Sequence, residues 1–232
     1  MNKHFLFYVP PGEIADNQIQ FPKEEANHIV KVLRKQTGDV IQVTDGVGNI
    51  MDVRLSEVDK TRVSGDVIAN YMTPAEPDRI LAFGVIRQRE RLEFAVEKAV
   101  ELGVTRLVFV HSEHAGKMDI KARRIDKTMI SAIKQSRRPW LPAWEERESF
   151  NDVLTEYKEG RNVIVAHPNE EGSYEWKPDD SPMLLLVGPE GGFSEKEVNH
   201  TLVSGARIVS LGQKRLRTET AACALLVLAN LR

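Results

Sequence analysis

Cysteine is almost absent from this chain of 232 residues, and Cys223 is its single example. One thiol excludes an internal disulfide and a cysteine-rich metal site. Because disulfides persist in oxidising compartments, this shortage predicts a cytoplasmic protein. The segment from Met1 to Gly12 also lacks the apolar core of a secretory signal peptide.

Long apolar runs are missing as well. The longest wholly apolar stretch, Ala221 to Ala229, has nine residues, about half of the ~18 that a membrane-spanning helix needs. Hydrophobic residues make up 41% of the chain and charged residues 28%, which is typical of a globular protein with one large or two small domains. The same composition excludes a wholly disordered chain.

The formal net charge is only −2, but the two signs are segregated along the chain. The segment from Lys117 to Arg138 carries +6, and the segment from Glu145 to Glu197 carries −9. A basic stretch of this kind attracts polyanions such as RNA. A solvated helix face is the alternative interpretation.

The N-terminal part of the chain, up to about residue 72, has the pattern of a small β-barrel. Short β-segments separated by turn residues are expected at 5–9, 40–44, 50–55 and 62–68. One short helix is expected from Lys23 to Lys35. Residues 71–77 contain Pro74 and Pro77 and resemble a linker.

The remainder of the chain, 73–232, alternates between strand and helix patterns and predicts an α/β domain. Apolar strand runs occur at 80–86, 106–110, 162–166, 183–187 and 208–211. A capping box of Ser194 and Glu197 marks the start of one helix, and another is expected from Thr218 to Leu231. Such alternation indicates a mostly parallel sheet covered on both faces, with ligands at the carboxyl ends of its strands.

Three loops follow strands of this predicted sheet and are the candidates for a binding site. The loop after Val187 contains Gly188, Gly191 and Gly192, which permit close backbone approach to a ligand. Neither the P-loop lysine nor a G-x-G-x-x-G pattern is present. A plain strand-to-helix turn without a ligand is the alternative.

The loop after Leu211 places Lys214, Arg215 and Arg217 just before the final helix. A helix N-terminus disfavours cations, so local stability does not explain this cluster. A bound anion explains it, and so does pairing with Glu219. The third loop, after Ala166, begins with His167, Pro168 and Asn169.

The sequence predicts no metal site. His111 and His114 stand three residues apart and lack the H-E-x-x-H spacing of a zinc-binding helix. Cys223 lies on the apolar stripe of the last helix and is expected to be a core residue rather than a nucleophile.

At these loops the chain resembles the SPOUT methyltransferases, and specifically the RsmE family of 16S ribosomal RNA uridine N3-methyltransferases. The resemblance covers nearly the whole chain. In the first domain it rests on His28, Leu33-Arg34, Gly38-Asp39 and Asp45-Gly46. In the second it rests on residues 97–104, Lys134-Gln135-Ser136, Pro142, residues 187–194, Leu211-Gly212 and residues 216–221. The chain departs from the family pattern at His4, His114 and Lys134.

The resemblance implies a PUA-like β-barrel (1–72) that binds RNA, followed by a trefoil-knotted SPOUT methyltransferase domain (73–232). It also implies a homodimer and S-adenosylmethionine as the methyl donor. The residues expected around this cofactor are His167, Val187, Gly188, Pro189, Glu190, Gly191, Leu211, Gly212, Leu216, Thr220 and Ala221.

Methylation of uridine N3 requires loss of a proton from a weakly acidic imide. Arg217 is the candidate for stabilising the resulting negative charge. Glu190, Glu219 and His167 are candidates for the general base, and Glu219 is equally a candidate for orienting Arg217. The residues expected to contact RNA of the small ribosomal subunit are His28, Lys31, Arg34, Arg123, Arg124, Lys134, Gln135, Arg137 and Arg138.

Two other functions share parts of this pattern. A SPOUT enzyme that methylates the ribose 2′-hydroxyl of tRNA would have the same cofactor loops. A non-catalytic RNA-binding assembly factor would have the basic surface without dependence on S-adenosylmethionine. The cluster of Arg217, Thr218 and Glu219 argues against the second of these.

Overall fold

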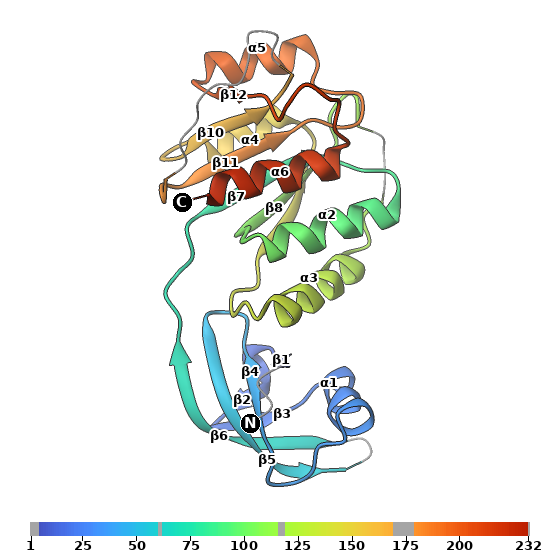
Figure 1. The fold of residues 1–232 in the computed structure, drawn as a ribbon, viewed down its shortest axis with the longest axis vertical. Helices are drawn as coiled ribbons and strands as arrows, with labels where there is room; N and C mark the ends of the chain where they lie inside the picture. The colour runs from blue at the N-terminus through green and yellow to red at the C-terminus, as the bar shows by residue number, and fades with distance from the viewer. Residues whose placement is uncertain (1–4, 60–61, 116–118, 169–178, 232) are drawn as a thin grey trace. The chain divides into compact units, whose positions relative to one another are not determined.

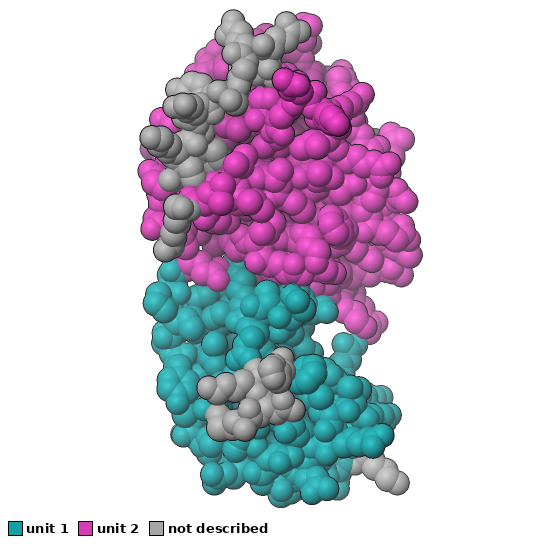
Figure 2. Space-filling view, in the orientation of Figure 1, with its two compact units in different colours: residues 1–75, 130–141 teal, residues 76–129, 142–232 magenta. Residues whose placement is uncertain are grey.

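The computed structural model describes residues 5–59, 62–115, 119–168 and 179–231. His4, Lys117 and Asn169 lie outside these ranges. The chain forms two compact units, which Figure 2 shows in separate colours. Unit 1 comprises Met1–Ala75 and Ile130–Leu141, and unit 2 comprises Glu76–Met129 and Pro142–Arg232.

Unit 1 is built on a six-stranded sheet with the order β1-β4-β5-β6-β3-β2 (Figure 1). Neighbouring strands are antiparallel except for the parallel pair of β1 and β4. Register shifts in the β5·β6 ladder mark bulges, which bend and twist a strand and help a sheet curl around its core. The strands are β1 (Leu6–Tyr8), β2 (Ile14–Ala15), β3 (Gln18–Gln20), β4 (Val40–Thr44), β5 (Asn49–Val58) and β6 (Val63–Met72).

The helical part of unit 1 differs from the single helix expected at 23–35. It consists of α1 (Lys23–Asn27) and a π-helical turn, η2 (His28–Val32), and Arg34 follows with φ of 51°. A 3₁₀ turn, η1 (Pro11–Glu13), precedes β2. The short strands β2 and β3 were not expected, because two or three residues are too few to show a period.

Residues 130–141 lie more than fifty positions beyond the rest of unit 1 in the sequence and still pack within it. Thr44 donates from its hydroxyl to the Pro139 carbonyl at 3.1 Å. Gly48 approaches the Trp140 ring so closely that a Cβ there would lie 2.4 Å from it. The buried carboxylate of Glu25 pairs with Lys134. This segment therefore completes the first unit.

Unit 2 contains an all-parallel sheet with the order β12-β10-β11-β7-β8-β9. The predicted parallel sheet is thus confirmed, and its central strands β7 and β11 are buried along their whole length. The strands are β7 (Arg79–Gly84), β8 (Arg106–Val110), β9 (Ala143–Arg147), β10 (Asn162–Ala166), β11 (Met183–Val187) and β12 (Arg207–Val209).

Helices cover both faces of this sheet. α2 and α6 pack against each other, and α6 contacts β7 and β11 (Figure 1). On the opposite face, Phe150, Val153 and Leu154 of α4 join a core with Ile80, Val165 and other strand residues, against which Val198 of α5 packs. The helices of unit 2 are α2 (Arg89–Glu101), α4 (Phe150–Tyr157), α5 (Glu195–Val203) and α6 (Thr218–Asn230). Helix α3 (Ala122–Ser136) begins in unit 2, and its residues from Ile130 onward belong to unit 1.

Strand β9 is the element of unit 2 that the sequence pattern did not reveal. It reads Ala-Trp-Glu-Glu-Arg and lies at the edge of the sheet. An edge strand faces solvent along one side, and charged side chains there are common. Its polarity therefore hides it from a search for buried apolar runs.

Candidate functional site

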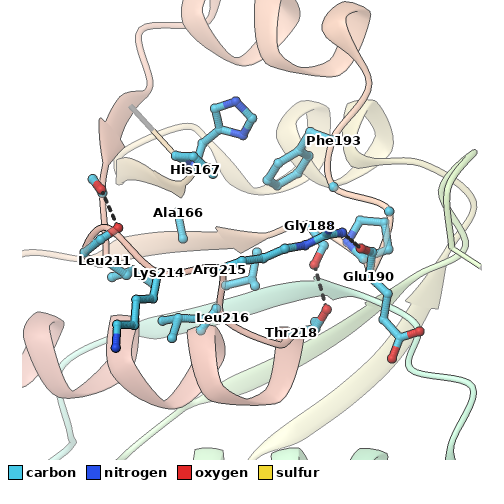
Figure 3. A pocket seen from close by; sticks show the side chains of 18 of the residues that line it. Ala166, His167, Gly188, Glu190, Phe193, Leu211, Lys214, Arg215, Leu216 and Thr218 are labelled. Atoms are coloured by element: carbon cyan, nitrogen blue, oxygen red, sulfur yellow. Dashed lines mark hydrogen bonds between the residues drawn. The ribbon is translucent and has the colours of Figure 1, made fainter. Parts of the chain in front are cut away.

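The loops after β10, β11 and β12 meet at the carboxyl ends of three adjacent strands and enclose a cavity of about 460 Å³. This volume lies in the range of roughly 300–1,000 Å³ that is typical of small-molecule sites. In Figure 3, His167 and Phe193 lie on one side of the cavity and Leu211 and Leu216 on the other. The remaining lining residues are Ala166, Pro168, Val187–Gly192, Ser210, Gly212–Arg215, Thr218 and Ala221.

Glycines bring the backbone close at two points of this site. Gly84, the last residue of β7, lies directly against Pro189, and a Cβ on Gly84 would be 2.5 Å from the Pro189 Cβ. A Cβ on Gly188 would be 3.1 Å from the Phe193 ring. The β11–α5 loop can therefore fold over the sheet edge only because these two positions carry no side chain.

Hydrogen bonds connect the loops to one another. The Thr218 hydroxyl donates to the Gly188 carbonyl at 3.1 Å, and the Arg215 guanidinium donates to the Glu190 carbonyl at 2.8 Å (Figure 3). Ser194 and Glu197 form the expected reciprocal capping box at the start of α5. The start of α6 is thus fastened to the glycine-rich loop after β11.

Arg91 of α2 holds two of the candidate catalytic carboxylates. Its Nε and Nη2 donate to the two oxygens of Glu219, each at 2.7 Å, and its Nη1 donates to Oε1 of Glu190. The side chains of Arg91 and Glu219 are 17% and 8% exposed, so this bidentate pair is largely removed from water. Arg91 lies 128 positions from Glu219, and no sequence signal pointed to the pairing.

These surroundings change the protonation of two candidate bases. Burial is the largest single influence on Glu219 and raises its pKa. The hydrogen bonds from Arg91 and from the backbone N–H of Glu219, together with the charges of Arg91 and Arg217, outweigh burial and leave the pKa below its ordinary value. Burial lowers the pKa of His167. Glu219 is therefore an ionised carboxylate with both oxygens engaged, whereas His167 favours its neutral form.

The structure brings the predicted cofactor residues together around the cavity, with the exception of Thr220. Thr220 is exposed on α6 and lies outside the described lining. Of the predicted catalytic residues, Glu190 lines the cavity. Arg217 and Glu219 flank the lining residue Thr218 without lining the cavity themselves, and Arg217 is the exposed N-cap of α6.

The predicted RNA contacts are divided between the two units and differ in exposure. Lys31, Arg34, Arg123, Arg124, Gln135 and Arg137 are exposed, and His28 is partly buried. Arg138 is only 6% exposed. Lys134 pairs with Glu25 and lies over the Phe7 ring, 5.9 Å from its centroid. Lys134 and Arg138 are thus parts of the packing of unit 1.

Burial raises the pKa of Glu25, and its partner Lys134 opposes that shift without cancelling it.

Within the described ranges, no three His, Cys, Asp or Glu side chains gather in a group able to hold a metal ion. The described helices include none with the length and apolar character needed to span a membrane.

Comparison with protein families places known domains on both parts of the chain. A model of the RNA methyltransferase domain matches residues 74–230, and a model of the RNA methyltransferase PUA domain matches residues 21–68. The first match spans more than half of the chain.

Individual relatives agree with these matches. Ribosomal RNA small subunit methyltransferase E of Bacillus subtilis is 30% identical over 216 residues, covering 85% of this chain and 84% of the relative. The same-named protein of Aquifex aeolicus is 30% identical over 185 residues, covering 75% and 78%. The crystal structure of the same-named protein of Neisseria gonorrhoeae, bound to S-adenosylmethionine, is 26% identical, with a TM-score of 0.79 over 96% of this chain and 95% of the other. The chain therefore belongs to the ribosomal RNA small subunit methyltransferase E family.

Proposed function

We propose that this protein transfers the methyl group of S-adenosylmethionine to N3 of a specific uridine near the 3′ end of 16S rRNA in the small ribosomal subunit. The observation that carries the proposal is the cavity at the carboxyl ends of β10, β11 and β12, whose walls come from the three loops that the sequence pattern selected. Its position agrees with the general location of ligands in parallel sheets.

The cavity fits the cofactor in size and chemistry. Leu211, Leu216 and Val187 supply apolar walls for an adenine ring. The backbone of Gly188 and Gly212 is accessible because neither residue carries a side chain. S-adenosylmethionine supplies an electrophilic methyl group on a sulfonium, and all the residues predicted to hold it except Thr220 line this cavity.

Of the two candidate carboxylates, Glu190 is the better placed to accept the N3 proton. Both oxygens of Glu219 are occupied by Arg91, whereas Arg91 engages only Oε1 of Glu190. Glu190 lines the cavity, and its side chain is 52% exposed. Glu219 then acts as a partner that fixes Arg91, and Arg217 stabilises the negative charge that develops on O2 and O4 of the uracil.

The remaining parts of the chain have roles in this proposal as well. Residues 1–72 bind RNA, residues 73–232 catalyse the transfer within a trefoil-knotted domain, and two copies work as a homodimer in the cytoplasm. The exposed cations Lys31, Arg34, Arg123, Arg124 and Arg137 contact phosphates, and such contacts position a protein on RNA without reading its sequence. The target base leaves its stack to reach the site.

The direct test uses small-subunit particles from cells that lack this gene. They are incubated with the protein and S-adenosylmethionine, and the digested RNA is analysed by mass spectrometry. We expect a gain of 3-methyluridine near the 3′ end of 16S rRNA. A 2′-O-methylated ribose, or methylation of tRNA alone, would overturn the N3 assignment. RNA binding that is independent of S-adenosylmethionine, without methylation, would identify an assembly factor.

The Arg217→Ala variant tests the charge-stabilising role. We expect turnover to fall by about 100-fold or more, as for loss of an oxyanion donor. Because Arg217 lies outside the described lining of the cofactor cavity, its removal should leave cofactor binding nearly unchanged. Titration calorimetry should show affinity for S-adenosylmethionine within a few-fold of the wild type. Loss of cofactor binding would contradict the role.

A further inference from the structure

A second cavity, of about 310 Å³, adjoins the cofactor cavity. It is lined by Val85, Arg87, His114, Glu190 and Gly191. Glu190 and Gly191 line both cavities, so the two cavities border on each other at this short piece of the β11–α5 loop. A group bound in the second cavity would therefore lie beside a group bound in the first.

The loop segment Glu190–Gly192, which borders both cavities, is held from several sides. A Cβ on Gly191 would lie 2.9 Å from the Cβ of His114, so the loop after β8 packs directly on the glycine. Nδ1 of His114 is 3.3 Å from the Gly192 carbonyl, and since a carbonyl only accepts, this nitrogen is the donor. Arg91 fixes the Glu190 carboxylate, and Arg215 holds the Glu190 carbonyl.

Two charged side chains of opposite sign, Arg87 and Glu190, line the second cavity. The Arg87 guanidinium is exposed, and within the described part of the chain it has neither a hydrogen bond nor an ion pair. Glu190 contributes an acceptor that Arg91 leaves half engaged. A cation with five donors and a carboxylate with a spare oxygen thus line the same cavity.

This combination matches the imide edge of uracil. That edge presents an acceptor at O2, a donor at N3 and an acceptor at O4. Arg87 offers donors to a carbonyl oxygen, and Glu190 offers an acceptor to the N3 proton. A cytosine carries an acceptor at N3, which a carboxylate would repel.

We infer that the second cavity is the subsite for the target uracil and that Arg87 binds one of its carbonyl oxygens. This inference rests on the proposed function. In the reaction the N3 electron pair forms a bond to the methyl carbon, and the bond between that carbon and sulfur breaks with its electrons passing to sulfur. The N3 proton goes to the Glu190 carboxylate, and Arg87 stabilises the charge on the uracil oxygen.

The test compares Arg87→Ala with Arg89→Ala. Arg89 is a matched control, because it lies two residues away, is 53% exposed and pairs only with Glu90 and Glu93 in the described structure. Both variants lose one positive charge from the same region, so any general effect on RNA affinity is shared. The readouts are the single-turnover methylation rate on unmethylated small-subunit particles and the dissociation constant of S-adenosylmethionine.

For Arg87→Ala we expect a rate about 100-fold below that of Arg89→Ala, in line with the loss of one donor to a developing oxyanion. Cofactor affinity should stay within two-fold of the wild type in both variants. Arg87→Lys should recover part of the rate, since it keeps the charge without the planar fork.

Two results would overturn the subsite. Equal methylation rates for the two variants would show that Arg87 does not bind the target uracil. A large loss of cofactor binding in Arg87→Ala would assign Arg87 to the first cavity. In both cases the proposed function stands if the wild type still forms 3-methyluridine. If the wild type methylates no uridine N3, the proposed function itself fails.

Discussion

Arg91 and Glu219 form an ion pair between residues far apart in the chain, and both side chains are mostly buried. Removing one partner of such a pair leaves the other charge without compensation in a poorly solvated place. Arg91 also reaches Glu190, so it connects α2 to the loop after β11 and to the first turn of α6. Arg91 therefore links three segments of unit 2 through one side chain.

The pair makes stability depend on pH in a defined direction. Because the folded-state pKa of Glu219 is lowered, its stabilisation is fully present above the ordinary Glu pKa of about 4.3 and is lost as the pH falls through the folded value. We expect Glu219→Gln to lower the free energy of unfolding at pH 7 by about 1–3 kcal/mol. The difference from wild type should shrink below pH ~4.

Urea unfolding at several pH values measures this effect, with Glu90→Gln as the control. Glu90 pairs with Arg89 on the surface, and its side chain is 67% exposed. Glu90→Gln should therefore lower the free energy of unfolding by less than about 1 kcal/mol. Equal destabilisation by the two substitutions at pH 7 would contradict the importance of the Arg91 pair.

At the scale of elements, the site depends on how strand ends and helix starts fit together. β7 ends at Gly84, which lies directly against Pro189 of the loop after β11. The hydroxyl of Thr218, the first residue of α6, donates a hydrogen bond to the Gly188 carbonyl of the same loop. Arg79, at the start of β7 and 1% exposed, donates to the carbonyls of Asp179, Ser181 and Ala229. Both ends of this central strand therefore anchor neighbouring segments.

Gly84→Ala tests the fit between β7 and the glycine-rich loop. The added Cβ would lie 2.6 Å from the backbone nitrogen of Pro189. This contact is with backbone, so no rotation of a flexible side chain can relieve it. We expect weaker binding of S-adenosylmethionine and a lower melting temperature, since overpacking typically costs about 1–3 kcal/mol. Calorimetry and thermal unfolding measure the two effects.

Gly12→Ala is the control for this substitution, because a Cβ at Gly12 would meet no atom within 4 Å. It should leave both quantities unchanged. If Gly84→Ala bound the cofactor as tightly as Gly12→Ala, the loop would be free to move away from β7, and the close contact would have no role in binding.

At the scale of the whole molecule, the chain is divided into two compact units that are not simple halves of the sequence. Unit 1 includes residues 130–141 in addition to the N-terminal part of the chain. Unit 2 contains all the residues that line the two described cavities. The ion pair of Lys134 with Glu25 shows why a basic residue within the +6 segment belongs to packing rather than to a free surface.

Hydrogen exchange on the intact protein tests the assignment of cofactor binding to unit 2. At a concentration 100 times its dissociation constant, a ligand stabilises the state it binds by about 2.7 kcal/mol. We expect S-adenosylmethionine to slow exchange in β7, β10, β11 and the first turn of α6. Slowing confined to β4, β5 and β6 would place the cofactor in unit 1 instead.

The sequence by itself determined the α/β class of unit 2 and the exact span of four strands, β4, β8, β10 and β11. It also selected the three loops that line the cavity at the carboxyl ends of β10, β11 and β12. The physical reason is local: buried strands require continuous or alternating apolar residues, and the carboxyl ends of neighbouring parallel strands share one edge.

Only the tertiary structure decided the partners of the charged residues and the composition of unit 1. Periodicity carries no information on which of many arginines meets Glu219, nor on the fact that Lys134 is paired within unit 1 whereas Arg87 lines a cavity. The edge strand β9 and the short strands β2 and β3 depend on ladder partners more than on their own residues. Such features arise from contacts between distant segments, which exist only once the chain has folded.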